Sequence, residues 1–368
     1  MNTQEQNLLP EKEKLDQLTV EAIALLKQLI TISSFSKEEN KTADLIQNYI
    51  AAKGVSTLRK LNNVWAVNKH YQKGKPTILL NSHHDTVKPN SGYTKDPFEA
   101  IEQDGKLFGL GSNDAGGCLV SLLATFLYFY DKPLANYNLV YVASAEEEIS
   151  GKNGIELVLP ELENVEFAIV GEPTQMHLAI AEKGLMVLDC VAHGKSGHAA
   201  RNEGENAIYK ALKDIEWFRT FQFPTISETL GPVKMSITII HSGSQHNVVP
   251  DKCEFTVDVR TTDMYSNEQA LEIIKQHVSC EIKPRSLRLK PSSISKEHSI
   301  VKAGLKLGRN TYGSPTTSDQ ALMNFSSLKL GPGDSARSHT ADEFIYVNEI
   351  KEGIELYAQM LSQVINYK

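Results

Sequence analysis

The sequence predicts an α/β fold with a mostly parallel central sheet, interrupted by an inserted α+β domain of ferredoxin-like type. In the first half of the chain, short apolar runs at 77–82, 138–145 and 167–172 alternate with helical patterns. Such runs are typical of strands buried on both faces, and their alternation with helices indicates an α/β sheet with helices on both sides. After Gly184 the predicted order becomes β-α-β-β-α-β, which is the order of a ferredoxin-like domain.

Three helices are predicted in the first half of the chain. Apolar residues at helical spacing within 20–30 predict the first. Ser36 and Glu39 have the spacing of a capping box and predict the start of the second. The apolar run from Cys118 to Tyr130 predicts a buried core helix, and its 13 residues are too few to span a bilayer.

The smaller domain is predicted to span 183–290. The expected strands and helices are a strand at 185–194, a helix at 206–218, strands at 233–243 and 252–261, a helix at 270–277 and a strand at 281–290. α/β character returns afterwards, and a last helix is expected from about Asn348. The larger domain is therefore predicted to comprise 1–182 and 291–368.

Composition excludes several classes of protein. The chain has 41% hydrophobic and 23% charged residues, a net charge of -7 and no run of Lys or Arg, so we expect no nucleic-acid partner. Residues 1–17 are polar and lack an apolar stretch, so no secretory signal is expected. No membrane partner is expected either. The four cysteines are scattered without CxxC spacing, which favours a reducing, cytoplasmic location.

Imidazole and carboxylate side chains follow all three predicted strands. Open α/β sheets bind ligands at the carboxyl ends of their strands, so these side chains are expected to converge. A further Asp precedes the core helix, and a further His lies in a late loop rich in Gly. The residues are His83, His84 and Asp85 after the first strand, 146–148 after the second, Glu172 after the third, and Asp114 and His339 in the loops.

This set of side chains fits a divalent metal site. Imidazole and carboxylate are ordinary Zn²⁺ ligands, and a pair of metals about 3.5–4 Å apart requires a bridging carboxylate. A carboxylate that is not a ligand can serve as general base. Each feature alone is more often structural: a Glu triplet, for example, is usually a solvated helix start. Their joint occurrence favours a catalytic metal site.

The motifs resemble those of the di-zinc amidohydrolase and peptidase family that includes acetylornithine deacetylase, succinyl-diaminopimelate desuccinylase and carboxypeptidase G. The resemblance implies a zinc-peptidase catalytic domain with an inserted lid and dimerisation domain. It covers nearly the whole chain. The matching motifs are Ser82-His83-His84-Asp85, Gly111-Ser112-Asn113-Asp114, Glu147-Glu148, Gly171-Glu172-Pro173 and the late Gly331, His339 and Glu343.

The resemblance also implies a role for each residue. Asp114 would bridge two metal ions, Zn²⁺ or alternatively Co²⁺. The remaining ligands would be His83 and Glu172 on one ion, and Glu148 and His339 on the other. Glu147 would be the general base, Asp85 would orient His83, and His84 would not be a ligand. The family often has Lys two residues after the bridging Asp, whereas this chain has Gly116 there.

Substrate contacts are expected from four further residues. His198, Asn247 and Arg260 lie in segments that resemble the family's lid signatures, and the resemblance implies that this domain also forms a homodimer. Arg337, two residues before His339, is predicted to reach the substrate. The alternatives are a surface-loop role for His198, an ion pair with a lid carboxylate for Arg260, and a solvated loop position for Arg337.

The resemblance implies an enzyme that removes a short acyl group from the α-nitrogen of an amino acid. N-acetylornithine deacetylation in arginine biosynthesis is the first choice. The alternatives are deacylation of N-acetyl- or N-succinylcitrulline, succinyl-diaminopimelate desuccinylation, hydrolysis of carrier-linked lysine or ornithine, and a dipeptidase. A non-catalytic binding homologue is the alternative from another class. The missing Lys favours it, and the presence of Glu147 and all five ligands argues against it.

Overall fold

The computed structural model describes residues 10–365 of the chain, so the prediction for residues 1–17 lies partly outside the described residues. The chain divides into two compact units. The first comprises Met1–Ile180, Ile294–Tyr312 and Ser318–Lys368, and the second comprises Ala181–Ser293 and Gly313–Thr317. The domain boundaries expected from the sequence stay predictions.

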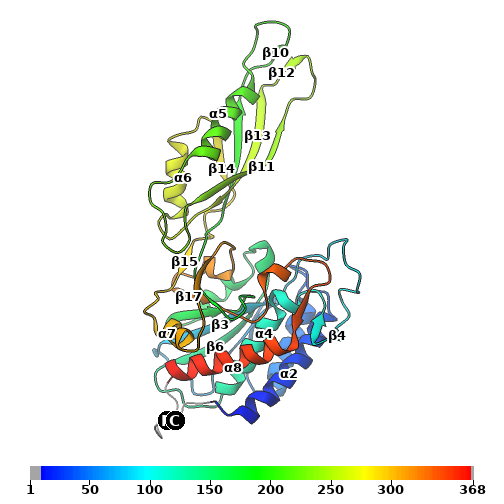
Figure 1. Cartoon of the computed structure of the whole chain (residues 1–368), viewed down its shortest axis with the longest axis vertical. Helices are drawn as coiled ribbons and strands as arrows, with labels where there is room; N and C mark the ends of the chain where they lie inside the picture. The colour runs from blue at the N-terminus through cyan, green and yellow to red at the C-terminus, as the bar shows by residue number, and fades with distance from the viewer. Residues whose placement is uncertain (1–9, 366–368) are drawn as a thin grey trace. The chain divides into compact units, whose positions relative to one another are not determined.

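A twisted mixed sheet forms the centre of the first unit (Figure 1). Its strand order is β1-β2-β6-β3-β7-β17-β8. The four central strands pair in parallel, and β1, β2 and β8 pair antiparallel with their neighbours. The mostly parallel sheet is therefore confirmed at its centre. The bounds are β1 (Leu58–Lys60), β2 (Asn63–Val67), β3 (Thr77–His83), β6 (Asn138–Ser144), β7 (Val165–Val170), β8 (Leu178–Glu182) and β17 (Ser326–Lys329).

Alternate residues of the central strands enter two separate cores. On β3, Ile78 and Leu80 face the first core and Leu79 faces the second. Helices pack on the first core, where α2, α4 and α8 lie side by side (Figure 1). Among residues 10–365, the helices of this unit are α2 (Lys12–Ile30), α3 (Asn40–Ala52), α4 (Gly117–Phe129), α7 (Ser299–Lys306) and α8 (Val347–Val364).

The second face of the sheet differs from the prediction of helices on both sides. It is covered by short turns rather than α-helices: η3 (Ile155–Leu157), η4 (Leu159–Glu161) and η5 (Asp319–Leu322). The segment between β6 and β7 contains Gly151, Gly154 and Pro160, which interrupt any longer helix. A small separate sheet of β4 (Ile101–Gln103), β5 (Lys106–Phe108) and β18 (Phe344–Tyr346) completes the unit.

The predicted capping box at Ser36 is wrong. Helix α3 begins at Asn40 and has no side-chain cap. The Ser36 hydroxyl donates to Asp85 Oδ2 at 2.7 Å, and the Glu39 carboxylate accepts from groups outside the helix. Both residues therefore serve tertiary contacts, which sequence spacing alone does not distinguish from capping.

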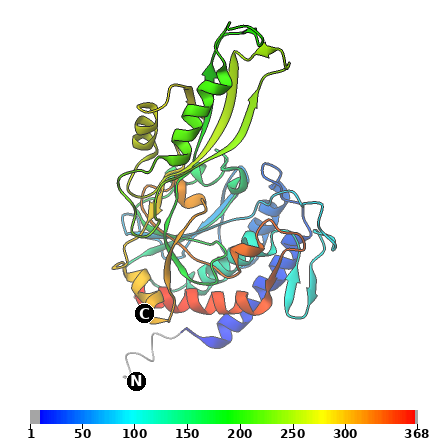
Figure 2. The same ribbon diagram turned by 45° about the horizontal axis from the view of Figure 1, so that its top comes forward.

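The second unit has the predicted order β9-α5-β11-β13-α6-β14, which confirms the ferredoxin-like arrangement. Its four strands form an antiparallel sheet in the order β11-β13-β9-β14, and both helices pack on one face of it (Figure 2). The bounds are β9 (Met186–His193), α5 (Ala207–Thr220), β11 (Lys234–Ser242), β13 (Lys252–Arg260), α6 (Asn267–Lys275) and β14 (Glu281–Pro284).

Four short strands remain. β10 (Gly197–His198) pairs with β12 (Val248–Val249) within the second unit. β15 (Ser292–Ser293) and β16 (Thr311–Ser314) pair with β8, through which the chain passes from one unit to the other. Within residues 10–365, no helix is both long enough and apolar enough to cross a membrane.

Candidate metal centre

The polar residues predicted at strand ends meet at one edge of the central sheet. β3 ends at His83, which is in register with Ser144 at the end of β6. The turn η2 (Glu147–Ile149) follows β6, and Glu172 follows β7. Because β6, β3 and β7 are adjacent and parallel, their carboxyl ends lie together.

Two groups of potential ligand atoms share Asp114. His83, Asp114 and Glu172 form one group, and Asp114, Glu148 and His339 form the other, with the ligand atoms of each group within 4.8 Å of one another. Asp114 Oδ1 lies 3.3 Å from His83 Nε2, and Asp114 Oδ2 lies 3.6 Å from His339 Nε2. The two carboxylate oxygens of one residue thus face two separate groups, which is the geometry of a bridging ligand.

The electrostatics of this cluster fit bound cations. Burial raises the pKa of Glu148, and so do neighbouring charges such as that of Asp114. A hydrogen bond to Glu148 raises the pKa of His339 to about 9. Burial alone would lower the pKa of His83, but hydrogen bonds to Asp114 and Asp85 raise it well above its usual value. Several largely buried carboxylates lie close together here and repel one another, so a bound cation would be stabilised among them. The imidazole and carboxylate donors suit a divalent transition metal.

Glu147 lies beside both groups but belongs to neither. Its Oε2 is 4.0 Å from His83 Nε2, and its side chain is 13% exposed. Burial, followed by the charges of Glu172 and Asp319, raises the pKa of Glu147 well above its usual value. A carboxylate of this kind can take up and hold a proton, as a general base requires.

Asp85 contacts His83 and also holds the turn of residues 146–148, which we call the acidic turn. Its Oδ1 accepts the backbone N–H of Glu147 at 3.0 Å, and its Oδ2 accepts that of Glu148 at 3.1 Å. His83 Nδ1 lies 3.0 Å from the Asp85 carbonyl oxygen and 3.4 Å from Asp85 Oδ1. The carbonyl is therefore the nearer partner of the imidazole, and the carboxylate also fixes the two Glu residues.

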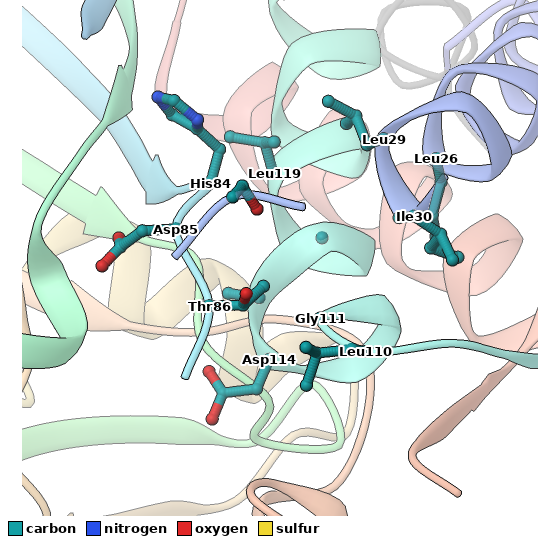
Figure 3. Close-up of a pocket in the computed structure, with 13 residues that line it drawn as sticks. Leu26, Leu29, Ile30, His84, Asp85, Thr86, Leu110, Gly111, Asp114 and Leu119 are labelled. Carbon is teal, nitrogen blue, oxygen red and sulfur yellow. The ribbon is translucent and has the colours of Figure 1, made fainter. Parts of the chain in front are cut away.

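His84 takes no part in either ligand group. Its Nε2 donates to the Asn62 carbonyl at 2.9 Å, and its Nδ1 lies 2.9 Å from the Thr42 hydroxyl. Burial lowers the pKa of His84 to about 4, so the ring is neutral near pH 7. Figure 3 shows the ring directed away from the Asp114 carboxylate. Both nitrogens have partners within the protein, and the assignment of His84 as a non-ligand stays a prediction.

Glu343 is a site residue whose role the sequence did not reveal. Its buried carboxylate accepts the backbone N–H groups of Gly111, Asn113 and Asp114 at 3.1, 2.8 and 2.9 Å. These bonds fix the short turn η1 (Ser112–Gly116), which carries the shared Asp114. Burial, together with the Asp114 charge, raises the pKa of Glu343 to about 8.

The same turn explains the missing Lys. A Cβ atom added at Gly116 would lie 2.5 Å from the Gly111 carbonyl oxygen and 2.6 Å from Leu26 Cδ1. The backbone oxygen belongs to the turn itself and cannot move aside cheaply. A side chain at residue 116 is therefore excluded by the local packing of this chain.

Three predicted substrate contacts lie in the second unit. His198 is exposed, and its Nδ1 accepts the backbone N–H of Ala200 at 3.1 Å. Asn247 is also exposed. Arg260 donates to Asp258 at 2.8 and 3.0 Å. Arg260 thus has the carboxylate partner considered as its alternative, and the substrate roles of all three stay predictions.

Arg337 has a defined structural environment. Its guanidinium donates to both carboxylate oxygens of Glu349, at 2.7 and 3.0 Å. It also lies 4.8 Å from the ring centroid of Phe344 and 5.1 Å from that of Tyr346. The side chain is only 18% exposed, so Arg337 is not a solvated loop residue. Its substrate role stays a prediction.

Several proteins of named function resemble this chain along most of its length. A [LysW]-lysine/[LysW]-ornithine hydrolase of Sulfurisphaera tokodaii is 28% identical over 92% of this chain and 94% of its own. A succinyl-diaminopimelate desuccinylase of Rickettsia bellii is 25% identical, over 93% and 96%. An acetylornithine deacetylase of Buchnera aphidicola is 26% identical, over 89% and 94%.

The fold is also that of solved proteins. The Bacillus subtilis YXEP protein, described as a dinuclear metal binding peptidase from the M20 family, superposes with a TM-score of 0.71 at 16% identity. The match covers 95% of this chain and 99% of that one. The family model of peptidase family M20/M25/M40 matches residues 79–363, which include every ligand candidate. The chain therefore belongs to peptidase family M20/M25/M40 and is a hydrolase of amide bonds.

Proposed function

We propose that this chain is a metal-dependent deacylase that removes a short acyl group from the α-nitrogen of an amino acid, with N-acetylornithine as the first-choice substrate. The observation that carries the proposal is the sharing of Asp114 between two ligand groups, with the non-ligand Glu147 beside them. The names of the relatives support the substrate class, because they act on acetylornithine, on succinyl-diaminopimelate and on LysW-linked lysine or ornithine.

The proposed ligands divide as the two groups do. His83, Asp114 and Glu172 would hold one ion, and Asp114, Glu148 and His339 the other. When bound, two divalent ions such as Zn²⁺ or Co²⁺ supply Lewis acidity for the amide carbonyl and lower the pKa of a bound water.

Glu147 performs the proton transfers in this proposal. Its carboxylate takes a proton from the attacking water, and the resulting carboxylic acid returns the proton to the amine nitrogen as the amide C–N bond breaks. Burial among acidic groups raises the pKa of Glu147, which favours uptake of that proton. Asp85 fixes the backbone of Glu147 throughout.

The second unit supplies the remaining proposed contacts. We assign Asn247 and Arg260 to the substrate's polar end and His198 to the carbonyl oxygen on which negative charge develops. In the proposed homodimer this unit forms the interface and His198 acts on the partner's site. The protein is proposed to be cytoplasmic, with a small N-acylated amino acid as its substrate and no nucleic-acid or membrane partner.

Metal analysis and a substrate panel test the proposal. The purified protein is assayed with acetylornithine, acetylcitrulline, succinylcitrulline, succinyl-diaminopimelate, acetyllysine and a dipeptide at equal concentration. Two metal equivalents and the highest kcat/KM on acetylornithine are expected. A higher value on another compound would assign that alternative. Two metals without hydrolysis of any compound would contradict the deacylase and support a binding protein.

A further inference from the structure

Two buried carboxylates hold three consecutive backbone amides of the acidic turn. The N–H of Glu146 points to Glu39 Oε1 at 3.2 Å, while those of Glu147 and Glu148 point to Asp85. Glu146 has a left-handed backbone with φ 54°. The position of the proposed base therefore depends on both acceptors, Glu39 and Asp85.

Glu39 is wholly buried, and every contact of its carboxylate lies outside helix α3. Besides Glu146, its Oε1 accepts the backbone N–H of Lys37 at 2.6 Å, and its Oε2 accepts from Asn62 Nδ2 at 2.8 Å. No cation pairs with it through these bonds. A buried carboxylate satisfied by N–H donors alone is costly unless all of its donors are retained.

The contacts of Glu39 continue into the motif that carries His83. Asn62, which donates to Glu39, also accepts at its carbonyl from His84 Nε2 at 2.9 Å. Thr42, in the first turn of α3, has its hydroxyl 2.9 Å from both His84 Nδ1 and the Glu39 carbonyl oxygen. A network of polar contacts around Glu39 thus links the start of α3, the end of β3 and the acidic turn.

We propose that Glu39 is a positioning residue for hydrolysis, holding the Glu146 amide so that Glu147 stands at the reacting atoms. The inference rests on the proposed function, because it assigns Glu147 as the base. It differs from a helix-capping role for Glu39, which affects only the stability of α3.

Variants that separate the length of the side chain from its charge provide the test. Glu39→Gln keeps the length, so its amide oxygen can still accept from Lys37 and Glu146, while Asn62 can turn its own oxygen toward the new NH₂ group. Glu39→Asp keeps the charge but is one methylene too short to reach Glu146. Asp is also a good N-cap residue, so a capping role predicts an active and stable Asp variant.

The proposal predicts instead that the Gln variant is more active than the Asp variant. Glu39→Asp is expected to lower kcat about 10–100-fold with KM and metal content unchanged, whereas Glu39→Gln stays close to wild type. Glu38→Asp, at the exposed neighbouring residue, is the matched control and should leave kcat unchanged.

Hydrogen exchange gives a readout that does not depend on activity. In the purified protein, with and without added metal, the Glu146 amide should exchange at least about tenfold faster in Glu39→Asp than in wild type. Amides of α8 should not change. Wild-type kcat or an unchanged Glu146 amide in Glu39→Asp would overturn the inference. If Glu147→Ala keeps full activity, the proposed function fails instead, and the two results are thereby distinguished.

Discussion

His339 Nε2 lies 3.0 Å from Glu148 Oε2, although 191 residues separate the two along the chain. Glu148 comes from the turn after β6, and His339 comes from the loop after β17. The His339 backbone is left-handed, with φ 59°, a conformation that costs a non-glycine residue about 1–3 kcal/mol and persists where surrounding contacts enforce it. This contact closes one ligand group without involving His83 or Glu172, so the two groups can be perturbed separately.

Substitution of the adjacent residues Glu147 and Glu148 is expected to affect activity and metal content differently. Glu147→Ala should abolish turnover and keep two metal equivalents, because Glu147 belongs to neither ligand group. Glu148→Ala should lose one equivalent, since it removes a ligand of one ion only. Metal analysis alongside the hydrolysis assay checks both variants. The reverse pattern would mean that the roles are shifted by one residue.

Arg337→Ala is expected to lower the free energy of unfolding by about 1–3 kcal/mol, because it removes a two-bond ion pair with Glu349 that is largely shielded from water. Chemical denaturation measures the loss. Arg219→Ala, which breaks an exposed pair with Glu216, is the control and should leave stability unchanged. The substrate panel adds a second readout. A changed order of substrates supports a role in specificity, whereas equal loss on all of them leaves Arg337 a structural residue.

His198→Ala is expected to lower kcat about 10²–10³-fold with metal content and dimerisation unchanged, since it removes one donor to the developing oxyanion. Mixing His198→Ala with Glu147→Ala after subunit exchange should restore part of the activity. One site of the mixed dimer then has both an intact Glu147 and an intact His198 from the partner. Demonstrated exchange without any recovered activity would show that His198 does not act across the dimer.

Asp319 links β3 and β6 near their carboxyl ends. Its Oδ2 accepts from Asn81 Nδ2 at 2.9 Å and from Ser144 Oγ at 2.6 Å, and the side chain is buried. Asp319→Ala leaves both buried donors without this acceptor, so we expect a loss of about 1–3 kcal/mol in the free energy of unfolding. Asp263→Ala, at an exposed position, is the control. A loss no larger than that of the control would contradict this account.

The residues that the strand ends bring to the candidate metal centre could be predicted, because a local signal places them. His83, the acidic turn and Glu172 follow apolar runs, and the carboxyl ends of adjacent parallel strands meet at one edge. The strands of the second unit could also be predicted. In β9, for example, alternate residues are buried, so an apolar residue stands at every second position of its sequence.

The supporting carboxylates could not be predicted, because their partners are distant and leave no local pattern. Glu39 contacts the Glu146 amide across 107 residues, and Glu343 contacts the Asp114 amide across 229. Glu39 also has the spacing of a capping box with Ser36, so a local rule gave a wrong assignment. The second face is a different case, because Gly151, Gly154 and Pro160 between β6 and β7 are a local signal against a long helix, and the prediction of helices on both faces did not use it.

The division of the second unit into two stretches limits how this protein can be recombined. Residues Gly313–Thr317 return to that unit after the main stretch has ended, and there Thr317 accepts a hydrogen bond from Arg260 and donates one to the Lys183 carbonyl. A chimera that exchanges only 181–293 would place a foreign strand against a native pentapeptide. A shortened chain that joins 180 to 294 would keep that pentapeptide without its partners. The second unit is therefore not encoded by one continuous stretch of sequence, and exchanging it between proteins requires both stretches to be transferred together.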